Sequence, residues 1–427
     1  MRTTWLAALA VGAVAATFAV PAGAQDYIQI GNLVDFTVNT AVVGKEYGQA
    51  KIDAMNYINE TGGINGKQLD FDTVDYSYIV PRALAAYKKW TSQRKVVTIQ
   101  GWGTADTEAL VDFVTKDQVP YYSASYSAHL TDPQGKGPEA KKAAPYNFPM
   151  GPSYSDGVRA LVQWAAADWK KQGKTGKPKY VHMGDNHPYP NAPKKAGEEY
   201  AKEMGFDVLP AIQYGLAPGD FKAQCLTLKE SGADYAFLAN TSDSNISMLK
   251  SCATVGVKAQ FMANIWGYDE NAMKAAGEAG NGVVWVMGAA KWGDDVPGMK
   301  LVQAVSKTSD PKGAAYRAVH YIRGVCAVYF MKEAMEWADK NGGINGPNIK
   351  KAMYQKKDWV PAGLEGACPP GTWGDTDHRA FTTVFVYRGM VKGSTDAPLT
   401  ELMKNGTISM AKIYEANVPR KPEWLGW

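Results

Sequence analysis

The sequence predicts an α/β protein of two domains, each built around a parallel β-sheet. Three observations support this. The chain has 427 residues, which is more than one hydrophobic core usually serves. Short apolar segments alternate with segments of helical periodicity, which is typical of βαβ units. One segment rich in Pro, Gly and Lys, residues 132–149, interrupts this alternation, which then resumes.

The first 24 residues are predicted to be a cleaved secretory signal. Arg2 gives a positive start, residues 5–20 form an apolar run, and Ala22-Gly23-Ala24 is a small-x-small cleavage site. The run is short for a bilayer-spanning helix, which needs about 20 apolar residues; an uncleaved anchor is the alternative interpretation. We therefore expect the mature chain to begin near Gln25 and to reside outside the cytoplasm.

Strands and helices alternate before the interruption. The strand at 96–100 is short and free of charge, as expected for a buried parallel strand. The predicted strands are residues 27–33, 69–76, 96–100 and 120–123. The predicted helices are residues 44–59, 81–94 and 105–115.

The same alternation continues after residue 149. The predicted strands there are residues 180–183, 206–213, 235–239, 260–263 and 283–287. The predicted helices among them are residues 156–170, 192–204, 221–230, 244–254 and 271–276. Two further helices are expected at 298–306 and 314–339.

Composition and motifs argue against several classes of function. With 46 basic and 42 acidic residues the charge is nearly balanced, which gives no basis for nucleic-acid binding. The chain lacks the G-x-S-x-G motif of the α/β-hydrolases. Its histidines show no metal-ligand spacing on a helix. We therefore expect neither an enzyme nor a bound metal or cofactor; a hydrolase using Ser or His is the alternative.

The four cysteines are predicted to form two disulfides. An even number in an exported chain favours disulfides, and without a C-x-x-C motif metal binding is the weaker interpretation. Three pairings are possible. Cys225 and Cys252 lie on successive predicted helices around one strand and can become neighbours, so we predict Cys225–Cys252 and Cys326–Cys368.

Several motifs occur in an order that resembles a known family. They are I-x-I-G at 28–31, the helix end at 58–66, Asp75, Ser231-Gly232-Ala233-Asp234, and Cys252-Ala253-x-x-Gly256. From about Tyr27 to about Gly393 the chain resembles the leucine/isoleucine/valine-binding type of periplasmic solute-binding protein. That resemblance implies a monomer that binds a small molecule and presents it to the membrane permease of an ABC importer.

The resemblance also implies two doubly wound lobes that close on the ligand about three hinge crossovers. The crossovers would fall near Asn147, Trp285 and Phe381. Lobe one would comprise residues 25–146 and 287–380, and lobe two residues 147–286 and 381–427.

In lobe one the resemblance points to the loops after the third and fourth strands. Thr104 ends the run Gly101-Trp102-Gly103-Thr104 before a helix and matches a residue that binds the ligand carboxylate; the alternative is that it only caps the helix. Ser125 and Ser127 match ligand-contacting positions and flank Tyr126.

In lobe two Tyr189 matches an aromatic that covers the ligand, and Thr241 matches another contact. The chain departs from the family where amino-acid binders carry an acid for the ligand ammonium. That position falls on Ile265 or Trp266, and the nearest acids are Asp269 and Glu270. The alternative is that either acid only caps the following helix.

Aromatic residues are frequent in these loops, and we expect part of this set to line the cleft: Trp102, Tyr126, Tyr189, Trp266 and Tyr268. Such a cleft would suit an aromatic or aliphatic carboxylate. The expected function is capture of a small carboxylate-bearing solute, either an amino acid or an aromatic or aliphatic acid. The alternative is an extracytoplasmic sensor lobe for small amides or quaternary ammonium ligands.

Overall fold

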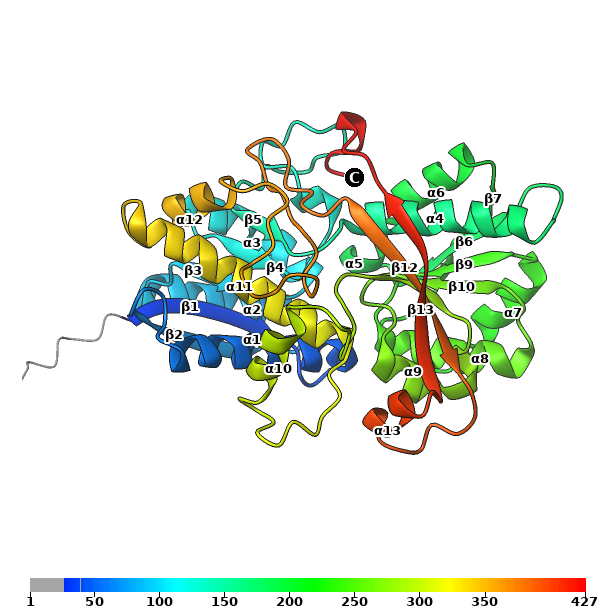
Figure 1. The fold of residues 1–427 in the computed structure, drawn as a ribbon. Coiled ribbons are helices and arrows are strands. Elements are labelled where there is room, and N and C mark those ends of the chain that lie inside the picture. Colours follow the sequence, from blue (N-terminus) through cyan, green and yellow to red (C-terminus); the bar gives the residue numbers. More distant parts are fainter. Residues whose placement is uncertain (1–26, 39) are drawn as a thin grey trace, which may run out of the picture.

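The protein consists of two sheet-centred lobes lying side by side (Figure 1). The structure is a computed structural model that describes residues 27–38 and 40–427. The predicted signal segment lies outside the described residues. No helix in the described part of the chain is long and apolar enough to cross a membrane.

The first lobe contains a parallel sheet of five strands in the order β2-β1-β3-β4-β5. Ile30 in its centre pairs with Phe71 on one side and Thr98 on the other. The strands are β1 (Tyr27–Val34), β2 (Gln68–Asp75), β3 (Thr98–Gln100), β4 (Tyr121–Ser123) and β5 (Asn147–Pro149). The short fifth strand was not predicted.

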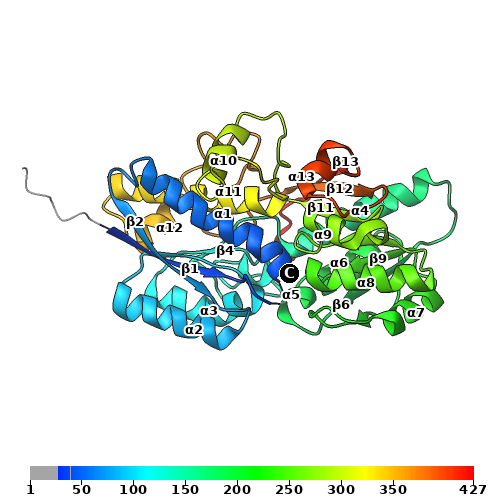
Figure 2. The same ribbon diagram turned by 90° about the horizontal axis from the view of Figure 1, so that it is seen from below.

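Helices cover both faces of the first sheet, with α1 and α11 on one side and α2 and α3 on the other (Figure 2). They are α1 (Ala41–Glu60), α2 (Val80–Lys89), α3 (Thr104–Asp117), α10 (Met299–Ser306), α11 (Val319–Lys340) and α12 (Gly346–Met353). A Cβ on Gly324 would lie 2.7 Å from the Tyr47 carbonyl oxygen. Glycine therefore lets α11 pack closely on α1 at this point.

The second lobe contains a mixed sheet in the order β13-β12-β11-β10-β9-β6-β7, with β8 beside β6. Its last two strands in the sequence are antiparallel. The strands are β6 (Lys179–Gly184), β7 (Asp207–Val208), β8 (Ile212–Gln213), β9 (Tyr235–Leu238), β10 (Gln260–Ala263), β11 (Val284–Met287), β12 (Thr383–Val391) and β13 (Ile408–Asn417).

Helices α4 and α6 lie on one side of this sheet, and α7, α8 and α9 lie on the other (Figure 1). The helices are α4 (Tyr154–Lys171), α5 (Pro188–Asn191), α6 (Lys194–Glu203), α7 (Lys222–Ser231), α8 (Ser242–Val255), α9 (Glu270–Ala276) and α13 (Leu399–Lys404). The chain passes between the lobes three times: between β5 and α4, between β11 and α10, and before β12.

The predicted parallel α/β fold is confirmed, but three local expectations differ from the structure. The strand expected at 206–213 is two short strands separated by a break that contains Pro210, which cannot donate a ladder hydrogen bond. The helix expected from residue 314 begins at Val319. The antiparallel pair β12–β13 was not predicted, because it does not follow the βαβ alternation.

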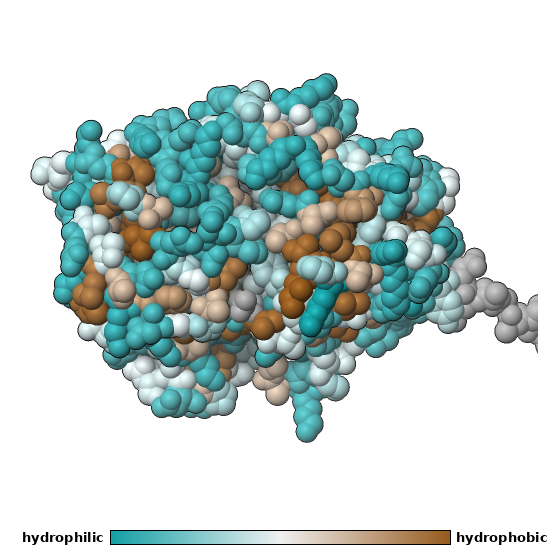
Figure 3. Space-filling view, turned by 180° about the vertical axis from the view of Figure 1, so that it is seen from behind, coloured by the Kyte–Doolittle hydropathy of each residue, from teal (hydrophilic) through white to brown (hydrophobic). Residues whose placement is uncertain are grey.

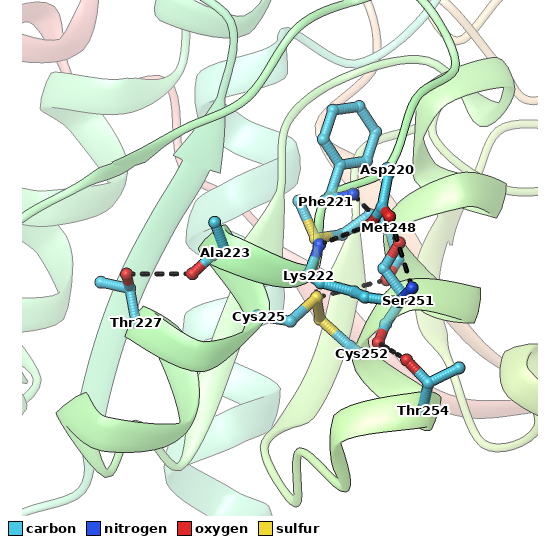
Figure 4. The surroundings of a disulfide bond; sticks show 10 residues. All are labelled: Asp220, Phe221, Lys222, Ala223, Cys225, Thr227, Met248, Ser251, Cys252 and Thr254. Carbon is cyan, nitrogen blue, oxygen red and sulfur yellow. Dashed lines mark hydrogen bonds and ion pairs between the residues drawn. A yellow bond between two sulfur atoms is a disulfide. The ribbon is translucent and has the colours of Figure 1, made fainter.

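Both predicted disulfides are present. Cys225 on α7 bonds Cys252 on α8, with Met248 beside them (Figure 4). Cys326 on α11 bonds Cys368 in the loop that follows α12. The bonds close loops with sequence separations of 27 and 42 residues. Loops of this length correspond to roughly 3–4 kcal/mol of stabilisation each in the chain-entropy model.

Candidate functional site

A cavity of about 20 Å³ lies between the lobes. The loops that line it follow β2, β3 and β4 of the first sheet and β6, β9 and β10 of the second, together with residues at the starts of α1 and α4. The lining residues are Thr40, Tyr78, Trp102, Gly103, Thr104, Ala124, Tyr154, Tyr189, Thr241 and Trp266. The carboxyl ends of parallel strands are the usual place for a ligand in open α/β sheets.

Thr104 is the first residue of α3 and is buried at the cavity wall. Its hydroxyl lies 2.8 Å from the Ser125 hydroxyl, and its backbone N–H donates to the Tyr78 hydroxyl over 3.3 Å. A Cβ on Gly103 would lie 1.8 Å from the Tyr78 ring. The glycine therefore allows Tyr78 to pack against the first turn of α3.

Tyr78 is held by an unusual backbone. Ser77 and Tyr78 have successive φ angles of +54° and +53°, a left-handed conformation that non-glycine residues seldom adopt. The Asp75 carboxylate accepts a hydrogen bond from the Ser77 N–H over 3.0 Å and fixes the turn. Such strain tends to be kept where a side chain must be positioned, and here it aims a tyrosine at the cavity.

Two tyrosines form the wall from the second lobe. Tyr154 and Tyr189 meet edge to face with ring centroids 5.2 Å apart. Burial raises the pKa of both phenols well above the ordinary value, so both are neutral and able to donate. The Tyr189 hydroxyl is buried and has no hydrogen-bond partner among the described residues. It is therefore a candidate donor to a ligand.

The amino-terminal ends of two long helices reach the cavity from opposite lobes. Gly103 and Thr104 begin α3, and Thr241 immediately precedes the first residue of α8. Helix amino termini carry a partial positive charge and favour anions. Among residues 27–38 and 40–427, none that lines the cavity carries a charged side chain. The electrostatic environment therefore comes from hydroxyl groups, backbone N–H groups and aromatic rings.

Trp266, in the loop after β10, crosses from the second lobe into the first. Its indole N–H donates to the Ala124 carbonyl over 3.1 Å. Its ring stacks on Tyr126 at 5.7 Å and meets the edges of Trp102 and Tyr47 at 5.0 and 5.2 Å. It is only 3% exposed.

The buried Arg323 on α11 covers another part of the Trp266 ring, with its guanidinium carbon 3.8 Å from the ring centroid. The guanidinium donates to the Tyr126 hydroxyl over 2.9 Å and lies 2.8 Å from His320 Nδ1. His320 Nε2 is 3.7 Å from the Asp269 carboxylate. Burial lowers the pKa of His320, so this imidazole is neutral.

The structure separates the predicted site residues into two groups. Trp102, Thr104, Tyr189, Thr241 and Trp266 line the cavity. Four others do not. Ser125 supports Thr104, Tyr126 lies behind Trp266, Ser127 donates to Glu108 over 3.4 Å, and the Asp269 side chain caps α9 by accepting from the Ala272 N–H over 2.7 Å.

Three of the lining side chains that carry a hydroxyl group were not predicted: Thr40, Tyr78 and Tyr154. Tyr78 stands three residues after a strand, a position that could have indicated it. Thr40 accepts from the Trp102 indole over 2.9 Å and donates to Asp35 over 2.6 Å, so it also orients Trp102.

A second contact between the lobes lies beside α1. The Asp243 carboxylate on α8 accepts from the Val42 N–H over 3.3 Å, and Asn271 donates to Glu46 on α1 over 3.4 Å. Glu270 accepts from the Val319 N–H over 3.1 Å. Burial raises the pKa of Glu46, Asp243 and Glu270 to about 7. We call these three carboxyl groups the acidic contact.

Comparison with known proteins shows the family to which this chain belongs. The sequence model described as "Periplasmic binding protein" matches residues 27–395. A substrate-binding protein of an ABC transporter from Aeropyrum pernix has a similar structure, with a TM-score of 0.77, 24% identity, and coverage of 94% of this chain and 98% of that one. No curated protein matches the chain in sequence.

Two further solved structures share the fold. A fatty acid ABC transporter substrate-binding protein from Thermomonospora curvata has a TM-score of 0.75 and 18% identity, covering 91% of this chain and 92% of that one. A branched chain amino acid ABC transporter protein from Thermus thermophilus with bound valine has a TM-score of 0.72 and 18% identity, covering 85% and 93%. At these identities the likeness concerns the fold.

Proposed function

Because this chain belongs to the periplasmic binding protein family, we propose that it captures a small carboxylate-bearing solute between its lobes and delivers it to the membrane permease of an ABC importer. The family consists of extracytoplasmic binding proteins, and we accordingly propose a periplasmic location and binding without turnover. The three passages of the chain between the lobes would act as hinges for closure.

One observation supports a carboxylate as the ligand. Hydroxyl groups and two helix amino termini from opposite lobes converge on one small cavity, and no described residue in its wall has a charged side chain. A carboxylate bound there would accept hydrogen bonds from donors such as Thr104 and Tyr189. Hydrogen bonds to a charged group contribute roughly 1.5–3 kcal/mol each.

The same cavity disfavours α-amino acids. A buried ammonium needs a carboxylate partner, and none of the lining residues supplies one. Asp269, the acid closest to the expected position, caps α9 and faces His320 instead. Burial raises the pKa of Asp269 well above its ordinary value, which also weakens it as an ammonium partner. We therefore propose acids that lack an α-amino group.

A thermal-shift screen of the mature protein tests this function. The screen pairs each acid with its isosteric amide, such as acetate with acetamide, and includes leucine and glycine betaine. A ligand at 100 times its Kd should stabilise the folded state by about 2.7 kcal/mol. We expect the acids to raise the melting temperature and the amides to leave it unchanged. Stabilisation by the amides alone would reject the carboxylate. Stabilisation by glycine betaine, which carries both a carboxylate and a quaternary ammonium, but by none of the simple acids would favour the sensor alternative.

A further inference from the structure

We infer that Trp266 is a specificity-determining residue that restricts the binding site to short ligands, of the size of a two- or three-carbon carboxylate. This inference rests on the proposed function in one respect, which is that the ligand is a carboxylate. It goes further by assigning a size limit and the side chain that sets it.

The size limit follows from the cavity volume of about 20 Å³. A cavity must offer about 10–15 Å³ of such volume to hold one water molecule. In this arrangement of the lobes the cavity therefore has room for little more than one water molecule. Acetate and propionate would need only a small movement of its walls, whereas an aryl acid would need a much larger opening.

Trp266 occupies the space that a longer ligand would need. Its ring fills a recess of the first lobe, which we call the aromatic recess, formed by Tyr47, Trp102, Tyr126 and Arg323. The recess adjoins the cavity, because Trp102 belongs to the walls of both and Trp266, which fills the recess, also lines the cavity. A residue of the second lobe thus takes the place of a ligand side chain.

The position of Trp266 is fixed by its polar contacts. The indole N–H has its acceptor at Ala124, and the guanidinium of Arg323 lies over the ring. Arg323 also donates to the Ile265 carbonyl over 3.4 Å, which holds the adjoining backbone. A ligand that displaced the indole would leave the Ala124 carbonyl without this donor and would break the cation–π contact.

Removal of the indole should convert the recess into a binding pocket. Three aromatic rings would line it, and the Arg323 guanidinium, whose Nε has no partner among the described residues, would supply a charge for an acid. Apolar cavities made by truncation remain open and accept ligands of matching shape. We therefore expect Trp266→Ala to admit phenylacetate and indole-3-acetate.

Isothermal titration of the mature protein tests the inference. The proteins are the wild type, Trp266→Ala, Trp266→Leu and a matched control, Trp164→Ala, which removes a buried indole that packs on Tyr235 in the second lobe. The ligands are acetate, propionate, phenylacetate, indole-3-acetate, and the amides acetamide and phenylacetamide. We expect the wild type to bind acetate or propionate at least tenfold more tightly than either aryl acid.

Trp266→Ala should bind the aryl acids at least tenfold more tightly than the wild type does, and Trp164→Ala should not. Comparable wild-type affinity for acetate and indole-3-acetate would overturn the size limit while leaving the carboxylate proposal intact. Binding of acetamide but not phenylacetamide would support the size limit and reject the carboxylate. Failure of all short ligands with the wild type would overturn the inference.

Folding of each variant is checked by circular dichroism. If Trp266→Ala does not fold, Trp266→Leu opens a smaller space and is tested with phenylacetate. A folded Trp266 variant that gains no affinity for either aryl acid would also overturn the inference.

Discussion

The aromatic recess and the acidic contact both join the two lobes, but they do so by different chemistry. The recess holds Trp266 among rings, with one hydrogen bond and one guanidinium. The acidic contact relies on carboxyl groups, including Asp243 and Glu46, that sit against the backbone and side chains of the opposite lobe. The recess is next to the cavity, so under the proposed function it would select ligands, whereas the acidic contact would make closure depend on pH.

Under the proposed hinge closure, the two contacts would respond differently to pH. Packing in the recess depends on shape and is insensitive to protons near neutral pH, since burial keeps Tyr47 and Tyr126 neutral. The acidic contact has three carboxyl groups with pKa values near 7. Lys45 and Arg317 lower the pKa of Asp243 and Glu46 respectively, but burial outweighs them.

The largest expected effect comes from the recess. Trp266→Ala should lower the free energy of unfolding by about 3–5 kcal/mol, the usual loss for a buried tryptophan. Because the recess does not titrate near neutral pH, the loss should be the same at pH 5.5 and pH 8. Urea unfolding at the two pH values measures it. A loss that changed by more than about 1 kcal/mol between them would contradict the distinction between the two contacts.

A smaller effect is expected at the cavity wall. Thr104→Val keeps the shape of the side chain but removes a hydroxyl that faces the cavity and pairs with Ser125. Ligand affinity should weaken by roughly 1–3 kcal/mol, the cost of losing one hydrogen bond to a buried group. Calorimetric titration with the best ligand from the screen gives the value. Unchanged affinity would remove Thr104 from the site.

The acidic contact predicts a pH dependence of ligand affinity. In this arrangement of the lobes, burial raises the pKa of Glu46, Asp243 and Glu270 to about 7, above the ordinary values of 4.5 and 3.8. Their contribution to closure is fully present below those ordinary values and is lost as pH rises through 7. Affinity should therefore weaken several-fold between pH 5.5 and pH 8.

The double variant Glu46→Gln, Asp243→Asn should flatten this dependence while keeping hydrogen-bonding side chains at both positions. Titrations at four pH values in one mixed buffer provide the measurement, and Trp266→Leu serves as the comparison with an intact acidic contact. An equally steep dependence in the double variant would mean that other groups control it.

The smallest effect is expected at Ser127, whose hydroxyl points to Glu108 and does not line the cavity. Ser127→Ala should change ligand affinity by less than about twofold, or roughly 0.4 kcal/mol. The same titration compares it with Thr104→Val. A larger loss would place Ser127 among the ligand contacts, as the family resemblance implies.

Residues that follow strands could be predicted as site residues from the sequence. Thr104, Tyr189 and Thr241 each come shortly after a parallel strand, and parallel strands bring such loops to one edge. The two disulfides could also be predicted from the sequence. Cys225 and Cys252 lie on successive helices that the strand–helix alternation brings together, and Cys326 and Cys368 are then the remaining pair.

Other features depend on contacts between distant segments. Arg323 lies on a helix whose residues are buried around most of its circumference, so periodicity gives no sign that it meets a loop 58 residues earlier in the chain. The left-handed backbone at Tyr78 has no glycine or asparagine to indicate it. The size of the cavity depends on where Trp266 packs, which only the assembled lobes determine.

The edges of the two sheets bear on how the protein behaves at high concentration. Two edges are formed by β5 and β7, which have only three and two residues. The long edge strand β2 carries Asp70 and Asp72, which pair with Arg94 and Lys89, and β13 carries an ion pair between Lys412 and Glu415. Short or charged edges discourage pairing with strands of another chain.

The pairing of β12 with the edge strand β13 is irregular, because its register shifts between Val386 and Tyr387. Such a bulge increases the local twist and makes the edge a poorer template. The face shown in Figure 3 is mainly hydrophilic, with its hydrophobic residues in several groups. These features resist edge-to-edge aggregation, so the protein should stay dispersed at high concentration.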